Sequence, residues 1–204
     1  MANQTVQVWD IAVRIFHWSL VIFFTVSYFT GEEESLTHIY TGYAVLGLVV
    51  FRLLWGFIGS RHARFSDFLY SRETVVEYLK SLVSGNPKSY SGHNPAGGWM
   101  VIALLVSLAL TTLTGIKVYG LEGHGPLADN QITLELIASA YADSDEHKYS
   151  GENEAEEELW EEIHEFWSNL TVLLIILHIA GVMISSRIHK ENLVKAMITG
   201  KKKK

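Results

Sequence analysis

Four long apolar stretches, separated by short or strongly charged segments, dominate the pattern of hydrophobic and polar positions along the chain. Arg52 is the only Lys, Arg, Asp or Glu inside their apolar cores. A helix needs roughly 20 mostly apolar residues to cross the hydrocarbon core of a bilayer. The pattern therefore predicts four membrane-spanning helices, over about residues 11–31, 35–58, 95–117 and 160–186.

These helices predict an all-α fold: an integral membrane four-helix bundle that forms a single domain over residues 1–204. The short GEEES segment makes the first two helices antiparallel neighbours. After the second helix, SRETVVEYLKSLVSG has the apolar spacing of a further helix, with Ser71 as its cap. We expect this helix to lie on the membrane or to pack under the bundle.

The distribution of basic residues predicts the orientation of the bundle. The N-terminus, residues 61–94 and the C-terminus fall on one side and, counted with Arg52, hold 14 of the 16 Lys and Arg; Lys117 and Lys148 lie opposite. By the positive-inside rule, both termini are predicted to be cytoplasmic. The final KKKK fits anionic lipid headgroups, and a solvated chain end is the alternative.

An acidic outer loop is predicted over residues 118–160. Residues 121–165 carry 14 Asp and Glu against one Lys, with a helix expected from about Asn153 that continues into the fourth span. The segment can be a solvated, partly flexible connection, or a docking face for a basic partner. Nothing in the sequence indicates a nucleic-acid partner.

Two histidines in the fourth span, His164 and His178, raise the question of cofactors because ionisable side chains are costly in hydrocarbon. Fourteen helical residues correspond to about 1400° of rotation and about 21 Å of rise, so both rings share a face but cannot share one metal ion. The chain has no cysteine, which excludes disulfides, thiolate-held clusters and covalently attached haem.

Each of these histidines has a partner at a matching depth. His17 lies about 9 Å inside the cytoplasmic end of the first span, and His178 lies about 12 Å from the same surface. His38 and His164 both stand near the outer surface. Two imidazole pairs from three helices would suit two haems, each with both axial positions filled by histidine. Hydrogen-bonded packing is the alternative role for each ring.

Neighbouring glycines and the remaining histidines complete the candidate chemistry. Gly42 and Gly181 each lie on the same helical face as a proposed ligand, where they would leave clearance for a porphyrin or allow close helix contact. His124 is near the outer surface and could replace His38 or His164. The others are expected to be solvated: His62, His93, His147 and His189.

The chain resembles the bacterial cytochrome b561 family, which includes the b-type cytochrome subunits of nickel–iron hydrogenases. The likeness covers nearly the whole chain apart from much of the acidic loop. The motifs that carry it are VWDIAVRIFHW, HIYTGY, FRLLWGFIGSRHARFSDF, GHNPAGGWM, GPLA, IHEFWSNL with LHIAGV, and HKENLVKAMITGKK.

The resemblance implies a multi-pass protein of the bacterial inner membrane that holds two non-covalent b-type haems. Its ligand pattern falls on His17, His38, His164 and His178. It also implies electron exchange between a partner on the outer face and the quinone pool.

Several functional hypotheses share this fold and cofactor. The acidic loop favours a periplasmic c-type cytochrome as redox partner, and a hydrogenase is the alternative. By charge alone, Arg14 and Arg52 are candidates for neutralising the propionates of the inner haem. A superoxide:quinone oxidoreductase is disfavoured, because an acidic face repels an anionic substrate. A haem-bearing membrane anchor remains a third reading, and no catalytic side chain is predicted.

Overall fold

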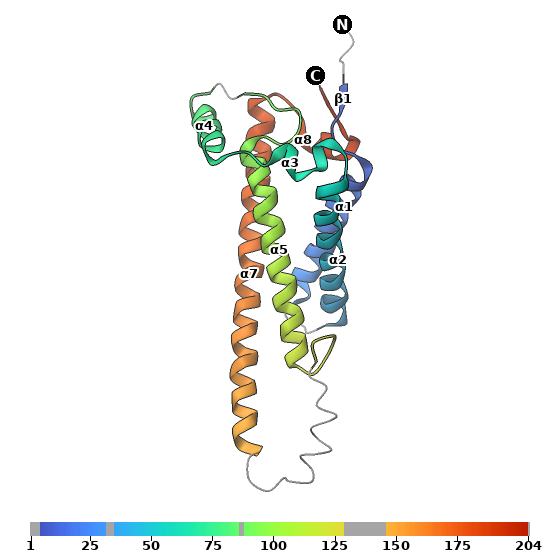
Figure 1. Cartoon of the computed structure of the whole chain (residues 1–204), viewed down its shortest axis with the longest axis vertical. Helices are drawn as coiled ribbons and strands as arrows, with labels where there is room; N and C mark the ends of the chain where they lie inside the picture. The colour runs from blue at the N-terminus through green and yellow to red at the C-terminus, as the bar shows by residue number, and fades with distance from the viewer. Residues whose placement is uncertain (1–4, 32–34, 86–87, 129–145, 204) are drawn as a thin grey trace.

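Four long helices stand side by side in the computed structural model, which describes residues 5–31, 35–85, 88–128 and 146–203 (Figure 1). They are α1 (Ile11–Phe29), α2 (Leu36–Ile58), α5 (Pro95–Leu121) and α7 (Glu146–Ile188). Each contains a stretch long and apolar enough to cross a membrane. The predicted helical membrane bundle is therefore confirmed, and the chain is a multi-pass membrane protein.

The acidic region is more helical than the predicted 118–160 loop. α5 continues to Leu121, and α7 already begins at Glu146, before the expected start near Asn153. The Glu and Ala residues that precede the apolar part of α7 are good helix formers, so charge there does not end the helix. The rest of the predicted loop, residues 129–145, lies outside the described residues.

Side-chain caps set where the spans begin. The carboxylate of Asp10 accepts a hydrogen bond from the Val13 amide at the start of α1, and the Ser35 hydroxyl accepts one from the His38 amide at the start of α2. Asn94 caps α5, where Pro95 occupies the first turn and needs no amide partner. Such caps satisfy amides that have no partner within the helix.

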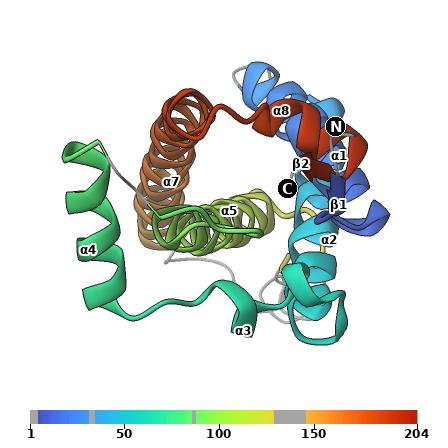
Figure 2. The ribbon, with the colours of Figure 1, turned by 90° about the horizontal axis from the view of Figure 1, so that it is seen from above.

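The helices pack in the order α1, α2, α5, α7, each along the next. Val45 and Val49 of α2 meet Leu108 of α5 in the apolar core, and Leu20 and Phe24 of α1 pack against them. Among the described residues, α7 and α1 make few close backbone approaches. The bundle therefore has three tight helix contacts and one loose side (Figure 2).

Buried hydroxyls join α5 to α7 within the membrane region. The Thr171 hydroxyl lies 2.6 Å from that of Ser107 and 3.2 Å from that of Thr111. Small hydroxylated residues let two membrane helices approach closely and hydrogen-bond across their interface. These contacts hold α7 at a fixed rotation against α5, which fixes the direction of its histidines.

Short elements cover the end of the bundle that carries both chain termini, here called the termini end (Figure 1). The 3-10 turn η2 (Arg61–Ala63) and α3 (Phe65–Phe68) follow α2 there, and α4 (Arg72–Val83) follows them. The helix predicted with a Ser71 cap is confirmed as α4, since the Ser71 hydroxyl accepts from the Thr74 amide. Figure 2 shows α4 at the edge of the bundle.

The two chain ends pair with each other, which the sequence did not indicate. α7 is followed by α8 (Leu193–Thr199), and β1 (Thr5–Gln7) pairs antiparallel with β2 (Lys201–Lys203). Gly200, with a φ of 80°, makes the turn from α8 into β2, a conformation that favours glycine. Among the described residues, the fold is thus all-α except for one small two-stranded sheet. The lysine tail was expected to be solvated or lipid-bound, and Lys201–Lys203 of it form a strand of this sheet.

Candidate functional site

His38 and His164 face each other at the end of the bundle opposite the termini end, here called the loop end. His38 is in the first turn of α2 and His164 is on α7, and their ring centres are 6.1 Å apart at an interplanar angle of 87°. Both side chains are half-buried. The structure therefore brings together the pair that matching depth predicts.

The two rings are oriented by backbone carbonyls. The Nδ1 atom of His38 lies 2.9 Å from the Ser27 carbonyl oxygen, and the Nδ1 atom of His164 lies 2.9 Å from that of Thr111. A carbonyl only accepts, so each Nδ1 carries the hydrogen and donates it. The neutral ring then presents its Nε2 lone pair, as in metal-binding histidines whose other nitrogen donates to a carbonyl.

Residues on α5 and in the first interhelical turn make room for this pair. A Cβ atom on Gly115 would lie 2.9 Å from Cε1 of His164, so only glycine leaves space for the ring. A Cβ atom on Gly31 would meet the His38 ring at 3.5 Å. The Thr114 hydroxyl also lies 3.1 Å from His164 Nδ1. Sequence reasoning missed these supporting residues because they are recognisable only by contact.

His17 and His178 form the second pair, nearer the termini end. His17 lies six residues after the start of α1, and His178 lies ten residues before the end of α7. They are close enough to interact electrostatically. Among the described residues, the buried Nδ1 atom of His17 has no hydrogen-bond partner. A buried polar atom without a partner is costly and indicates that a contact is missing.

Open space lies beside one histidine of each pair. A Cβ atom built on Gly42 or Gly181 would meet no atom of the described residues within 4 Å. Close helix contact, the alternative role considered for these glycines, is therefore wrong. They widen the space next to His38 and His178.

Arg52 is buried at the termini end of α2, with 3% of its surface exposed. Its guanidinium lies over the rings of Phe65 and Phe68, at 5.2 and 5.8 Å from their centres. Among the described residues, its Nη1 atom has no hydrogen-bond partner. A buried guanidinium without such a partner calls for an anionic acceptor.

Arg14, the other predicted basic residue, is engaged with the C-terminal segment. Its Nη2 atom donates a hydrogen bond to the Ile198 carbonyl at the end of α8. Its Nε atom is buried without a partner among the described residues. The neighbouring Trp9 is buried against Val8 and Ala196.

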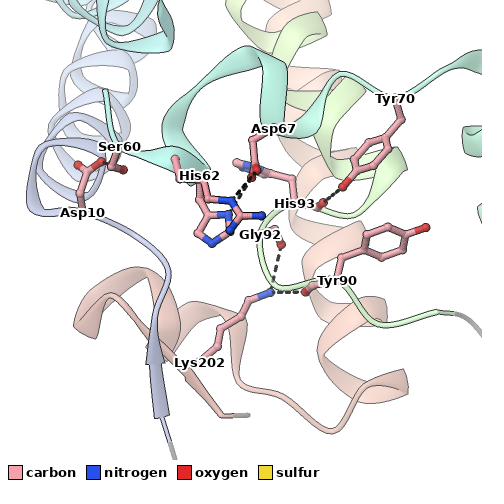
Figure 3. Close-up of polar contacts among 10 residues, drawn as sticks. Asp10, Ser60, His62, Asp67, Tyr70, Tyr90, Gly92, His93 and Lys202 are labelled. Atoms are coloured by element: carbon pink, nitrogen blue, oxygen red, sulfur yellow. Dashed lines mark hydrogen bonds and ion pairs between the residues drawn. The ribbon is translucent and has the colours of Figure 1, made fainter. Parts of the chain in front are cut away.

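Two histidines expected to be solvated belong to the structure of the termini end. The His62 Nδ1 atom lies 2.7 Å from the Asp67 carboxylate, and 18% of its side chain is exposed (Figure 3). His93 lies between Trp9 and Phe68, with ring centres 4.6 and 4.7 Å away. Burial, together with the nearby cations Arg52 and Lys202, lowers the pKa of His93 to about 3, so the ring is neutral.

The remaining histidines are not at either pair. His124 is exposed and stacks on Tyr119, with ring centres 5.3 Å apart. His189 is half-buried just after α7. His147 lies among residues whose side chains are outside the described set.

The fold defines a class, namely helical membrane bundles in which histidines of different helices approach each other. The profile of the prokaryotic cytochrome b561 family matches residues 8–200. The chain belongs to this family, as its motifs predict. Its function is therefore electron transfer in the membrane by way of b-type haem.

Curated relatives resemble the chain along nearly its whole length. A protein of Bradyrhizobium diazoefficiens, named probable Ni/Fe-hydrogenase B-type cytochrome subunit, is 24% identical over 99% of this chain and 87% of its own length. Proteins of the same name from Rhizobium leguminosarum bv. viciae and Rhodobacter capsulatus are 23% and 22% identical, over 98% and 97% of this chain and 90% and 81% of their own lengths. No solved structure gives a significant match.

The residues present fit a haem at both levels. Metal–nitrogen bonds of about 2 Å place two imidazoles on opposite sides of one metal with ring centres roughly 6 Å apart, which is the spacing of His38 and His164. At the other level, His17 offers an unpartnered ring nitrogen, Gly181 leaves open space and Arg52 offers an unpartnered donor. A haem needs a nitrogen ligand for its iron, space for its ring and a hydrogen-bond donor for its propionate carboxylates.

Proposed function

We propose that the chain carries electrons across the bacterial inner membrane through two b-type haems. One is held by His38 and His164, and the other by His17 and His178. The electrons pass between a periplasmic redox partner at the loop end and the quinone pool, with both termini in the cytoplasm. The basic composition of the termini end supports this orientation.

The observation that carries the proposal is the arrangement of the pairs along α7. His164 and His178 share one face of this helix, about 21 Å apart along its axis, and each has a histidine of another helix opposite. One metal centre cannot be bound by both histidines, because they lie too far apart along the helix. Two centres stacked along the membrane normal can divide the crossing into shorter steps.

The protein positions the haems and tunes their redox potentials. When bound, each haem supplies an iron centre that takes up and gives back one electron. With two histidines holding each haem, the chain would leave no position on the iron for a reacting ligand. The Ser27 and Thr111 carbonyls hold the rings of His38 and His164 in the metal-binding tautomer. Arg52, as a buried cation, would pair with a propionate and stabilise the reduced centre.

Two classes of redox partner are proposed for the outer side of the membrane. The names of the relatives support a hydrogenase, whereas the acidic segment over residues 121–165 supports a c-type cytochrome with a basic face. The same acidic segment disfavours superoxide as an outer substrate. Reduction of the purified protein by hydrogen with added hydrogenase, compared with reduction by a basic c-type cytochrome, distinguishes the two partners.

The experiment that tests the function uses liposomes that contain the protein and enclose ferricyanide, with an impermeant reductant outside. Wild type is expected to reduce the enclosed ferricyanide, and His164→Ala and His178→Ala are each expected to abolish this, since either change interrupts the path. His124→Ala, which alters an exposed histidine, is the matched control. Full transfer by His164→Ala would contradict the proposal and favour a membrane anchor.

A further inference from the structure

Two buried nitrogen atoms without partners lie beside the same aromatic ring at the termini end. Arg52 Nη1 and His93 Nδ1 both lack a hydrogen-bond partner among the described residues, and both belong to side chains that pack on Phe68. They are close enough for their charges to interact. Two buried polar nitrogens without partners, both on side chains that pack on Phe68, indicate that a contact is missing at this point.

His93 cannot turn out to water, because its surroundings fix it. Its ring is held between Trp9 and Phe68, and its own carbonyl accepts a hydrogen bond from the Tyr70 hydroxyl at 3.3 Å. The Nζ atom of Lys202 donates to the Gly92 and Tyr90 carbonyls at 3.2 and 3.4 Å (Figure 3). The loop is therefore tied to the C-terminal strand on one side and to α3 on the other.

The nearby protein carboxylates already have partners. Asp10 accepts from Ser60, Trp55 and the Val13 amide. Asp67 pairs with His62, and Glu191 pairs with Lys202. A guanidinium has only donors, so its missing partner must accept hydrogen bonds. Asp10 is near enough for its charge to interact with Arg52, but among the described residues none of these acids hydrogen-bonds the Arg52 Nη1 or the His93 Nδ1 atom.

We propose that His93 is a second anchor, beside Arg52, for a propionate carboxylate of the haem held by His17 and His178. This inference rests on the proposed function. A charge on His178 would lower the pKa of His93, so the two rings lie near each other. Nδ1–H of His93 and the guanidinium of Arg52 donate to one carboxylate. Lys202 is a positioning residue that seats the loop carrying His93.

The test uses the full chain loaded with haem whose propionate carboxylates carry ¹³C. Infrared difference spectra between the reduced and oxidised protein then report those carboxylates directly, and a redox titration reports the potential of each haem. His93→Leu removes the donor at similar volume. His93→Asn keeps an N–H near the position of Nδ1, and His124→Leu is the matched control at the loop end.

His93→Leu is expected to shift the labelled carboxylate band and to lower the midpoint potential of one haem, because a lost donor leaves more negative charge near the iron. His93→Asn is expected to restore both, and His124→Leu to match wild type. An unshifted band and potential in His93→Leu would overturn the inference. If that variant is not recovered, His93→Phe decides, because it also lacks the donor but keeps an aromatic ring between Trp9 and Phe68: a shifted band supports the inference, and a wild-type band contradicts it.

Failure of the proposed function gives a different result. A wild-type protein without haem, or one that keeps both haems after His17→Ala and His178→Ala, would refute the ligand assignment itself. If both haems are present but the labelled carboxylate band is the same in His93→Leu as in wild type, the inference about His93 is wrong and the proposed function still stands.

Discussion

The ring of His38 on α2 stands edge-on to the ring of His164 on α7, with their centres 6.1 Å apart. Each ring donates from Nδ1 to a carbonyl of a third segment: Ser27 at the end of α1 and Thr111 within α5. All four spans thus contribute to this one pair. The spacing and orientation suit two ligands of one metal better than a packing contact between two side chains.

The open space beside His38 gives a first prediction. Gly42 and Gly47 both lie on α2, and a Cβ atom at either would meet no described atom within 4 Å. Gly42 is about 40° from His38 around the helix, whereas Gly47 is about 180° away. Gly42→Leu is therefore expected to reduce the haem content from two toward one per chain, and Gly47→Leu to leave it at two.

Haem-to-protein ratios of the two purified variants check this prediction. Neither change should unfold the apo chain, because leucine favours a helix over glycine by about 1 kcal/mol. Equal haem contents in Gly42→Leu and Gly47→Leu would show that the space beside His38 holds no cofactor.

Helical periodicity was enough to predict the four spans and the approach of His38 to His164. Both depend on spacing along single helices, which the sequence contains. The same reasoning placed His93 in solvent, because GHNPAGG reads as a polar break before a span. Trp9, Phe68 and Lys202 bury this loop from three distant parts of the chain. Only the tertiary structure reveals such contacts.

The lysine tail is a second such case. Four consecutive lysines indicate a lipid-bound or solvated end, yet Lys202 has a side chain only 10% exposed and pairs with Glu191. Its burial depends on the pairing of β2 with β1, across almost the full length of the chain. Short polar strands carry little periodic signal, so this sheet could not be predicted.

The buried His93 predicts a pH dependence of stability in chain produced without haem. Burial, with the adjacent cations, lowers its pKa from 6.5 to about 3. Below about pH 6.5 the His93 imidazole binds a proton in the unfolded chain but stays neutral in the folded chain. The free energy of unfolding therefore falls as the pH drops toward 3. Thermal unfolding of His93→Leu should lose this component and depend less steeply on pH. Parallel curves for the two proteins would contradict the burial of a neutral imidazole.

Lys202 predicts a difference between two neighbouring lysines. Lys202→Met removes the donor to the Tyr90 and Gly92 carbonyls, whereas Lys201→Met alters an exposed side chain of the same strand. Lys202→Met is expected to speed amide hydrogen exchange in residues 88–94 severalfold and to lower the midpoint potential of one haem. If residues 88–94 exchange as slowly in Lys202→Met as in Lys201→Met, the conformation of this loop does not depend on Lys202.

The acidic region predicts salt-sensitive docking. With 14 Asp and Glu over residues 121–165, the rate of electron transfer from a basic c-type cytochrome should fall as salt rises from low to physiological concentration. Over that range the screening length shrinks from about 30 to about 8 Å. Stopped-flow rates at several salt concentrations measure this effect. A constant rate would remove the cytochrome-docking hypothesis and leave the hydrogenase as the proposed partner.

The most direct test of the account is the reduced-minus-oxidised absorption spectrum of the detergent-purified protein, recorded together with the haem-to-protein ratio. We expect two b-type haems per chain, each held by two histidines. We expect one haem after His38→Ala, one after His17→Ala, and two after His124→Ala. A single haem in wild type, or two haems that survive the loss of His38, would contradict the assignment of two histidine pairs.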